Sequence, residues 1–464
     1  MNKIKPKLIF YELNEVPRKV LEKYIKLYPN SAFAEIVQKG ILLDTFTRDE
    51  GELHPWSTWP TVHRGVPNTT HKIYYINQDL SEAAKYKPIW EILSENSIDV
   101  GIFGALQSYP PIKGKHVKFH LPDTFAPASD SYPEKLSEFQ SFNLDLSGSN
   151  KAKVREVSKK NIINAINLVL QGDVSVIAAF KSVFHLFKEK INPKYKARRS
   201  TLQAVLSFDL FRKYLEKYNP IFSNYFTNHV AGIMHRFWID LFPPDSIAKL
   251  EVDDFHSKSI LKAMRIADNH IRYLLKINKT KNYNIIVLSS MGQESIKQEE
   301  YSPEITLNNL SKLINTIELD PKDFKLMPAM QPQVTIECNN KKSLDLLRER
   351  VKNIKDVDGN QLLVEGYPPL ALRLTLSMKA SKCLSISNKI FYLNRELDLE
   401  SVGFELFSRD QGSAYHIPEG ILIAKGAEIE QCLVGYSPSP LDTCKIAPLI
   451  LNLYGIEAPS YMKL

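Results

Sequence analysis

Four short segments of this sequence carry polar side chains that could bind a metal ion or attack an electrophile. Each lies beside an apolar run that predicts a β-strand. They are Glu12-Leu13-Asn14-Glu15, the stretch 55–61, Thr227-Asn228-His229 with His235 six residues later, and His416. In an open sheet of parallel strands, ligands bind at the carboxyl ends of the strands. We therefore expect these segments to meet at one edge of a sheet and to form one site.

Three histidines and a carboxylate are enough ligands for zinc or a similar divalent ion. A hydroxyl beside such an ion loses its proton more readily and becomes a nucleophile, and Thr58 or Ser57 could play that part. We expect the helix after Pro60 to point backbone N–H groups towards an anion held there. On a continuous helix, six residues rotate by about 240°, so His229 and His235 can share an ion only if the chain turns at Gly232.

Familiar motifs for other chemistries are absent from the sequence. It contains no G-x-x-x-x-G-K-[ST], G-x-G-x-x-G, H-E-x-x-H or G-x-S-x-G pattern. Its four cysteines form no close C-x-x-C pair, which argues against a disulfide framework and a structural zinc knuckle. With 44% apolar and 24% charged residues, the composition is typical of a globular protein.

The apolar pattern predicts an α/β protein in which strands alternate with helices, an order typical of a parallel sheet covered by helices. The predicted strands are Lys7–Leu13, Gly40–Asp44, Ile98–Phe103, Asn224–Thr227, Asn284–Leu288 and Gly420–Ala424, with helices over Phe255–Leu275 and Cys444–Leu453. We expect a core of residues 1–134, 221–329 and 411–464. A basic helical insert at 135–220 and a small α+β insert or cap at 330–410 would interrupt it.

The positive charge is concentrated in one segment. The net charge is +8, and residues 151–220 hold 15 Lys and Arg against five acids. Basic, partly amphipathic helices either lie on an anionic membrane or form a solvated cap. No run reaches the roughly 20 apolar residues that span a bilayer, so we expect a cytoplasmic protein and leave open a peripheral membrane contact through 151–220. Nucleic acid is not an expected partner, and a homodimer stays open.

The order of the motifs resembles the alkaline phosphatase superfamily, and within it the type I phosphodiesterase/nucleotide pyrophosphatase group. Thr58-Trp59-Pro60 is similar to the family's nucleophile motif, and residues 65–71 to its Gly-x-x-Pro-x-x-His segment. His416 is similar to the late histidine, and Lys445–Leu451 to the closing signature. The resemblance covers 7–130, 222–295 and 411–459. It implies a three-layer αβα sandwich with a mostly parallel central sheet.

The resemblance also implies an activity, the hydrolysis of a phosphodiester or phosphomonoester. Thr58 would be the nucleophile and would form a phospho-threonine intermediate that water hydrolyses. One or two divalent ions, zinc or manganese, would be held by Glu12, Asn14, His229, His235 and His416. The residues expected to contact substrate are Asn228, Trp59 and His71. The substrate would be a phosphorylated small molecule, a lipid-linked compound or a glycan precursor.

The chain departs from the family pattern at the second metal site. The family's opening Asp-Gly pair is replaced by Glu12-Leu13-Asn14, and its Ser-Asp-His-Gly stretch reads Ser289-Ser290-Met291-Gly292, without the Asp and His ligands. Three alternatives stay open: a one-metal phosphodiesterase, an enzyme that binds a second ion weakly, and a degenerate member that binds a phosphorylated ligand without hydrolysing it. Transfer to an alcohol instead of water would make the protein a transferase. The sulfatase motif C/S-x-P-x-R is not matched.

Overall fold

The computed structural model of the chain describes residues 5–76, 78–147, 159–243, 253–295, 304–327, 329, 333–366, 371–378, 387–407, 413–434 and 440–463. The chain divides into two compact units. The described residues of the core unit lie within 5–295 and 414–463, and those of the inserted unit lie within 304–413.

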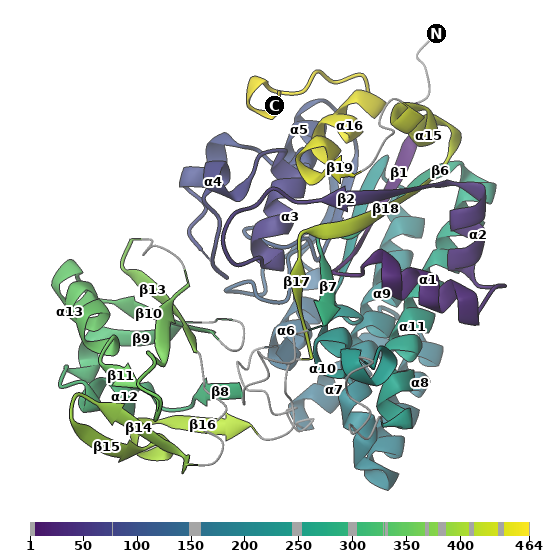
Figure 1. The fold of residues 1–464 in the computed structure, drawn as a ribbon. Helices are drawn as coiled ribbons and strands as arrows, with labels where there is room; N and C mark the ends of the chain where they lie inside the picture. Colours follow the sequence, from purple (N-terminus) through teal and green to yellow (C-terminus); the bar gives the residue numbers. More distant parts are fainter. Residues whose placement is uncertain are drawn as a thin grey trace. The chain divides into compact units, whose positions relative to one another are not determined.

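An eight-stranded sheet runs through the middle of the described core unit (Figure 1). β18 is antiparallel to both of its neighbours, and the other strands run parallel to one another. The mostly parallel sheet predicted from the sequence is therefore confirmed, with β18 as the one reversed strand among those described. The order is β19 (Leu441–Asp442), β2 (Ile41–Phe46), β18 (Glu419–Lys425), β6 (Tyr283–Leu288), β1 (Lys7–Leu13), β5 (Phe222–Thr227), β3 (Val100–Phe103) and β4 (Val117–Leu121).

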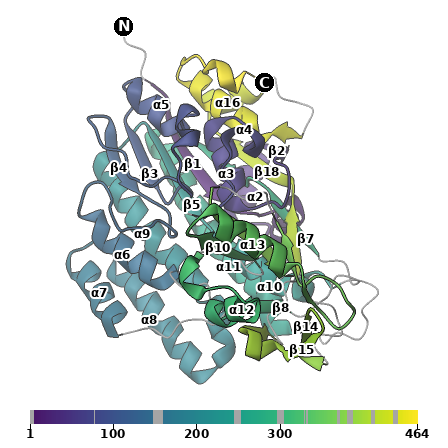
Figure 2. The same ribbon diagram turned by 90° about the vertical axis from the view of Figure 1, so that its left-hand side faces the viewer.

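Helices cover both faces of this sheet and give the predicted three layers (Figures 1 and 2). Two separate apolar clusters, one on each face, hold the layers together. The helices on the first face are α1 (Arg18–Leu27), α2 (Ala32–Lys39), α6 (Leu136–Ser147), α7 (Lys159–Leu170), α8 (Val176–Ile191), α9 (Ser200–Tyr218), α10 (Ala231–Leu241) and α11 (Asp254–Lys281). Those on the second face are α3 (Pro55–Arg64), α5 (Ile89–Glu95), α15 (Ala427–Leu433) and α16 (Ile446–Leu453), with the short α4 (Asn68–His71) beside α3.

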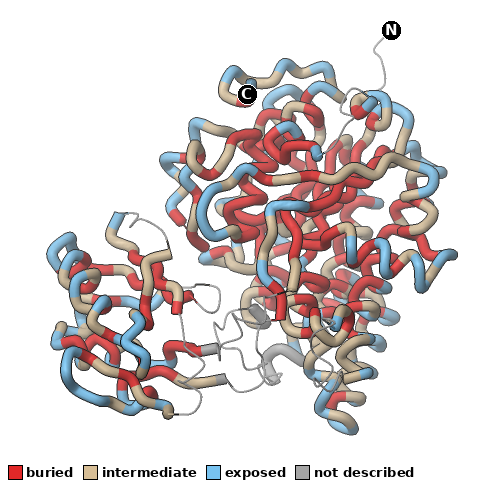
Figure 3. Tube along the Cα trace, viewed as in Figure 1, coloured by how far each residue is buried: buried red, intermediate tan, exposed pale blue. Residues whose placement is uncertain are grey.

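β1 lies between β5 and β6 and supplies side chains to both faces, as the period of two in a strand requires. Ile9, Tyr11 and Leu13 belong to the first cluster, and Leu8 and Phe10 to the second. All five are fully buried, and the strand lies in the buried centre of the core unit in Figure 3. The next polar residues of the chain are therefore delivered to the carboxyl edge of the sheet from a rigid, fully packed strand.

Two short strands extend from this edge, β7 (Gly292–Ser295) and β17 (Ala414–Ile417), and they pair antiparallel. Backbone crowding explains the glycines at the start of β7 and near the start of β18, the strand that follows β17. A Cβ on Gly292 would lie 2.3 Å from the carbonyl oxygen of Glu419, and a Cβ on Gly420 would lie 2.3 Å from that of Ser289. Only glycine lets these backbones approach so closely.

The region 135–220 is helical, as expected, although residues 148–158 lie outside the described part of the chain. The last of its helices, α9, belongs to the core, because Phe208 and Phe211 are buried in the same cluster as β1. α8 and the following 3₁₀ helix η2 (Pro193–Arg198) lie at the opposite end of the core unit from α16 in both ribbon views (Figures 1 and 2).

The inserted unit has its own apolar cluster and small antiparallel sheets. An α+β insert was predicted for 330–410, whereas the compact unit takes in residues from 296 to 413, so the described residues 304–327 and 329, predicted as core, belong to it. Its described elements are β8 (Glu304–Leu307), α12 (Leu310–Thr316), β9 (Phe324–Met327), β10 (Gln333–Cys338), α13 (Lys341–Val351), β11 (Ile354–Lys355), β12 (Leu363–Glu365), β13 (Arg373–Met378), β14 (Lys389–Tyr392), β15 (Arg395–Asp398) and β16 (Phe404–Phe407).

None of the helices in the described ranges combines the length and the apolar character needed to cross a bilayer.

We expect Phe10→Ala to destabilise the core unit by about 3–5 kcal/mol, because it leaves a cavity in the strand between the two helix layers. The chain's four tryptophans are buried in the core unit, so urea unfolding followed by tryptophan fluorescence reports on that unit. Leu27→Ala, at a side chain that is 47% exposed, is the control and should change stability by less than about 0.5 kcal/mol. Equal midpoints for the two variants would contradict the layer assignment.

Candidate metal centre

Three side chains from distant parts of the sequence meet at the carboxyl edge of the sheet: Glu15, His235 and His416. Oε2 of Glu15 lies 2.9 Å from Nε2 of His235 and 3.2 Å from Nε2 of His416. The two Nε2 atoms are 3.1 Å apart. The three potential ligand atoms thus form a nearly equilateral triangle.

Each of these side chains is positioned by a different element. Glu15 follows β1 and adopts a left-handed backbone conformation with φ 61°, which is uncommon for a residue with a Cβ and is found at functional sites. His235 lies on α10, and His416 lies on β17 opposite Gln293 of β7. The Glu15 side chain is 2% exposed, that of His416 10% and that of His235 27%, so a ligand can approach from the His235 side.

A second layer of hydrogen bonds orients the triangle. Nδ1 of His235 donates to the carbonyl oxygen of Ala414 at 3.2 Å, which turns its Nε2 towards Glu15 and His416. Nδ2 of Asn14 donates to Oε1 of Glu15 at 2.6 Å, and Nε2 of Gln293 donates to Oε2. Glu15 and His235 are therefore each held in place by a group that is not itself a ligand.

Electrostatics keep Glu15 ionised. Burial alone would raise the pKa of this carboxyl, but the neighbouring His416 and His235 hold the pKa well below its usual range. His54, the residue before α3, adds a neutral ring: burial, with His416 nearby, lowers the pKa of His54 to about 3. Its ring centroid lies 5.9 Å from that of His416. The cluster therefore places an ionised carboxylate beside two imidazole rings.

The donor set fits a divalent ion such as zinc. Two imidazole nitrogens and one carboxylate oxygen leave an open fourth position in a tetrahedral site. With bonds of about 2.0–2.1 Å, tetrahedral ligands stand about 3.3 Å apart, close to the sides of the observed triangle. Oε1 of Gln293 is buried and has no hydrogen-bond partner among the described residues, so a ligand of the ion could donate to it.

Thr58, the predicted nucleophile, is fully buried in α3, and its hydroxyl is hydrogen-bonded to that of Ser290 at 2.8 Å. The expectation of a helix starting after Pro60 was wrong, because α3 begins at Pro55 and contains Pro60. The backbone amide of Thr58 donates to the carbonyl of His54 at 2.9 Å. That amide is therefore not available to an anion.

Asn14 connects α3 to the triangle. Its Oδ1 accepts from Nε1 of Trp59 at 2.8 Å, and its Nδ2 donates to Oδ1 of Asn228 at 2.7 Å as well as to Glu15. Asn14 thus acts beside the ligand triangle and is not a member of it. Trp59 is fully buried and packs in the second-face cluster, whereas Asn228 is exposed and can meet a ligand.

Glu12 and His229, both predicted as metal ligands, lie elsewhere. Oε1 of Glu12 accepts from Nε2 of His63 at 2.9 Å and from Nδ2 of Asn224 at 3.0 Å, on the α3 side of β1. Nε2 of His229 donates to the carbonyl of Ala263 at 3.0 Å, and its Nδ1 accepts from Thr227 at 2.8 Å. Both ring nitrogens of His229 are therefore occupied in tying β5 to α11, and burial lowers the pKa of its ring to about 4.

His71, predicted to contact substrate, is also occupied. Its Nε2 is hydrogen-bonded to the Thr61 hydroxyl at 2.9 Å, and its Nδ1 accepts from the amide of Ile73 at 3.0 Å. Burial lowers the pKa of this ring to about 3. His71 thus stabilises the turn after α4.

Sequence reasoning missed two residues of this centre, Glu15 and Gln293. Glu15 belongs to a segment that was singled out, but Glu12 and Asn14 were chosen as its ligands. Gln293 lies directly after the stretch that departs from the family pattern. No local signal marks it, because β7 is only four residues long, and only the pairing of β7 with β17 places Gln293 opposite His416.

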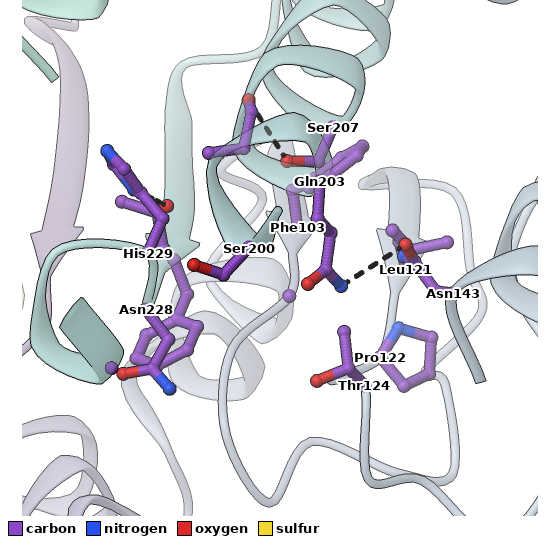
Figure 4. Close-up of a pocket in the computed structure, with 15 residues that line it drawn as sticks. Phe103, Leu121, Pro122, Thr124, Asn143, Ser200, Gln203, Ser207, Asn228 and His229 are labelled. Atoms are coloured by element: carbon purple, nitrogen blue, oxygen red, sulfur yellow. Dashed lines mark hydrogen bonds between the residues drawn. The ribbon is translucent and has the colours of Figure 1, made fainter. Parts of the chain in front are cut away.

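A pocket of about 130 Å³ lies next to the centre, at the ends of β3, β4 and β5 (Figure 4). Asn228, which bonds to Asn14, forms one wall. Figure 4 shows hydroxyl and amide groups around the space, from Thr124, Ser200, Gln203 and Asn228. The lining holds no carboxylate, ammonium or guanidinium group, so it suits an uncharged polar ligand.

No family model matches the sequence, and no curated protein shows significant sequence similarity to it. Among solved structures, the chain is similar to murine ectonucleotide pyrophosphatase/phosphodiesterase 5 (11% identity, 99% of each chain covered, TM-score 0.44). It is also similar to phosphonoacetate hydrolase from Sinorhizobium meliloti 1021 in complex with phosphonoformate (12% identity, 98% of this chain and 100% of that chain covered, TM-score 0.46). Both come from the alkaline phosphatase superfamily, which the sequence motifs resemble.

We expect Glu15→Gln and His416→Ala each to weaken zinc binding by roughly 100-fold or more, because each removes one of three ligand atoms. Isothermal titration calorimetry on the metal-stripped protein measures this loss. His229→Gln is the matched control and should keep the wild-type affinity. A folded His229→Gln protein that has lost zinc binding as fully as His416→Ala would show that the ligand set is wrong.

Proposed function

We propose that the core unit is a metal-dependent phosphoester hydrolase whose ion is held by Glu15, His235 and His416. The observation that carries this proposal is the triangle of three ligand atoms at the carboxyl edge of the sheet, with sides of 2.9–3.2 Å. Side chains of this type at this edge of an α/β sheet are typical of a catalytic site. Zinc suits the donors best, and manganese is the alternative.

When bound, a divalent ion supplies Lewis-acid stabilisation for the negative charge on phosphoryl oxygens. Thr58 supplies the nucleophile: its Oγ1 bonds to phosphorus, its proton passes to solvent, and the ester oxygen leaves and takes up a proton. Water then attacks phosphorus of the phospho-threonine and restores the hydroxyl, releasing a phosphomonoester when the substrate is a diester and phosphate when it is a monoester. Ser290 positions Thr58 through the 2.8 Å hydrogen bond. Gln293 and Asn14 orient the Glu15 carboxylate through their hydrogen bonds.

The neighbouring pocket supports a substrate class. Its amide and hydroxyl lining would hydrogen-bond an uncharged, hydroxyl-bearing group such as a sugar or glycerol. Asn228 belongs to the pocket and bonds to Asn14, so a phosphoester at the metal centre could extend its alcohol portion into this space. A glycan precursor or a lipid headgroup has this chemistry.

The second candidate function is binding of a phosphorylated ligand without turnover. The observation that favours it is the complete burial of Thr58, Ser290 and Met291. Because the Thr58 side chain has no exposed surface, its hydroxyl must break the hydrogen bond to Ser290 before it can attack phosphorus. The two candidates differ in whether Thr58 ever becomes phosphorylated.

We expect the zinc-loaded wild-type protein to hydrolyse bis-p-nitrophenyl phosphate, and Thr58→Ala to lower kcat/KM by on the order of 10³-fold. Thr58→Ser, which keeps the hydroxyl, should retain most of the activity. Acid quenching followed by mass spectrometry should find a p-nitrophenyl phosphoryl group on Thr58.

Two results would change this assignment. Full turnover by Thr58→Ala would make water the direct nucleophile. No turnover of a phosphodiester panel, together with calorimetric binding of phosphate to the zinc-loaded protein, would establish the binding function instead.

The pocket has its own test. We expect Gln203→Leu to lower kcat/KM roughly tenfold for a glycerol phosphodiester, since it removes a hydrogen bond to an uncharged group. Activity on bis-p-nitrophenyl phosphate should not change, because this substrate carries no hydroxyl groups for the pocket. An equal loss on both substrates would contradict a recognition role.

A further inference from the structure

The most unusual surface of the core unit lies on α8. Seven large apolar side chains of this helix are 49–73% exposed. We call this set the α8 apolar face: Val176, Ile177, Phe180, Val183, Phe184, Phe187 and Ile191. At about 100° per residue, these positions fall within an arc of about 120°. Apolar residues in such number and alignment mark an interaction surface.

The opposite side of α8 shows that this exposure is not the ordinary packing of a surface helix. The side that faces the protein carries mainly small and polar residues and one large apolar residue, Leu186, and the buried residues of the helix are Ala178 and Glu189. Glu189 accepts hydrogen bonds from Nε of Arg199 at 3.0 and 3.1 Å. A globular helix normally turns its apolar stripe inward. In α8 the stripe faces outward, and the acid of the helix is turned inward.

Lysines border the α8 apolar face. Lys181 and Lys188 lie on one flank and Lys190 on the other, by their positions in the helix. Nζ of Lys188 lies 4.5 Å from the ring centroid of Phe184. The pKa of Lys262 is lowered, first by its partial burial and then by the positive groups around it, which include Lys188 and Lys181. The surroundings of α8 therefore carry positive potential.

We propose that the α8 apolar face is a membrane-docking surface that inserts into the interface of an anionic lipid bilayer. An apolar stripe with phenylalanines, bordered by lysines, is typical of helices that lie in the plane of a membrane. Charge complementarity selects anionic headgroups, because lysines near the surface are attracted to them. The described helices include none able to span a bilayer, so docking is peripheral. This surface does not depend on the proposed activity.

Sedimentation of the full chain with vesicles tests the proposal. We expect binding to vesicles of phosphatidylcholine and phosphatidylglycerol in equal parts, and weaker binding to phosphatidylcholine alone. The triple variant Phe180→Ser, Phe184→Ser and Phe187→Ser should reduce the partition coefficient roughly tenfold or more. Lys181→Glu with Lys190→Glu should reduce binding to the anionic vesicles and leave the weak binding to phosphatidylcholine unchanged.

Val434→Ser, at an apolar side chain that is 76% exposed elsewhere in the core unit, is the matched control and should bind like wild type. In a second measurement, Phe184→Trp provides an exposed tryptophan, since Trp56, Trp59, Trp90 and Trp238 are all buried. Its emission should shift to shorter wavelength when anionic vesicles are added, and zinc binding confirms that each variant is folded.

Several outcomes would overturn the proposal. They are absence of wild-type binding to both kinds of vesicle, unchanged binding by the triple variant, and no emission shift in Phe184→Trp. A wild-type dimer in sedimentation velocity that the triple variant abolishes would assign the face to a second copy of the chain instead.

Discussion

The buried carboxylate of Glu15 is the constraint on which the arrangement of the sheet's carboxyl edge depends. An ionised carboxylate with 2% exposure is costly to bury unless charged or hydrogen-bonding partners surround it. In this protein the partners come from α10, β7 and β17, through His235, Gln293 and His416. The need to compensate one charge therefore brings together segments that are more than 200 residues apart in sequence.

Much of the fold could be predicted from the sequence, because period and composition are local properties. β1 has the bounds that its apolar run indicates, and the three-layer arrangement follows from alternating strands and helices. The direction of β18 could not be predicted, since the residues of a buried strand are apolar whichever way the strand runs. β7 and β17 are only four residues long, too short for a recognisable alternation.

The candidate site was predicted in part, because the type of a residue and its position after a strand are also local properties of the sequence. His235 and His416 lie near strand ends in sequence and meet in space. Glu15 could not be chosen over Glu12, because the direction of the Glu15 side chain depends on its left-handed backbone conformation at φ 61°. In a strand, a shift of one residue also moves a side chain to the opposite face of the sheet. His229 has the right residue type in the right segment, but its ring nitrogens are used within the core.

The pairing of β7 with β17 has a consequence for how this chain is assembled. Ser295 and Ala414 lie opposite each other at the ends of the two strands, and the inserted unit begins and ends directly beyond them. In topological terms the whole insertion is the loop of a hairpin. The core can therefore close without waiting for the insertion to fold, and a gene encoding a short turn, or a different domain, could replace residues 296–413 without a change in connectivity.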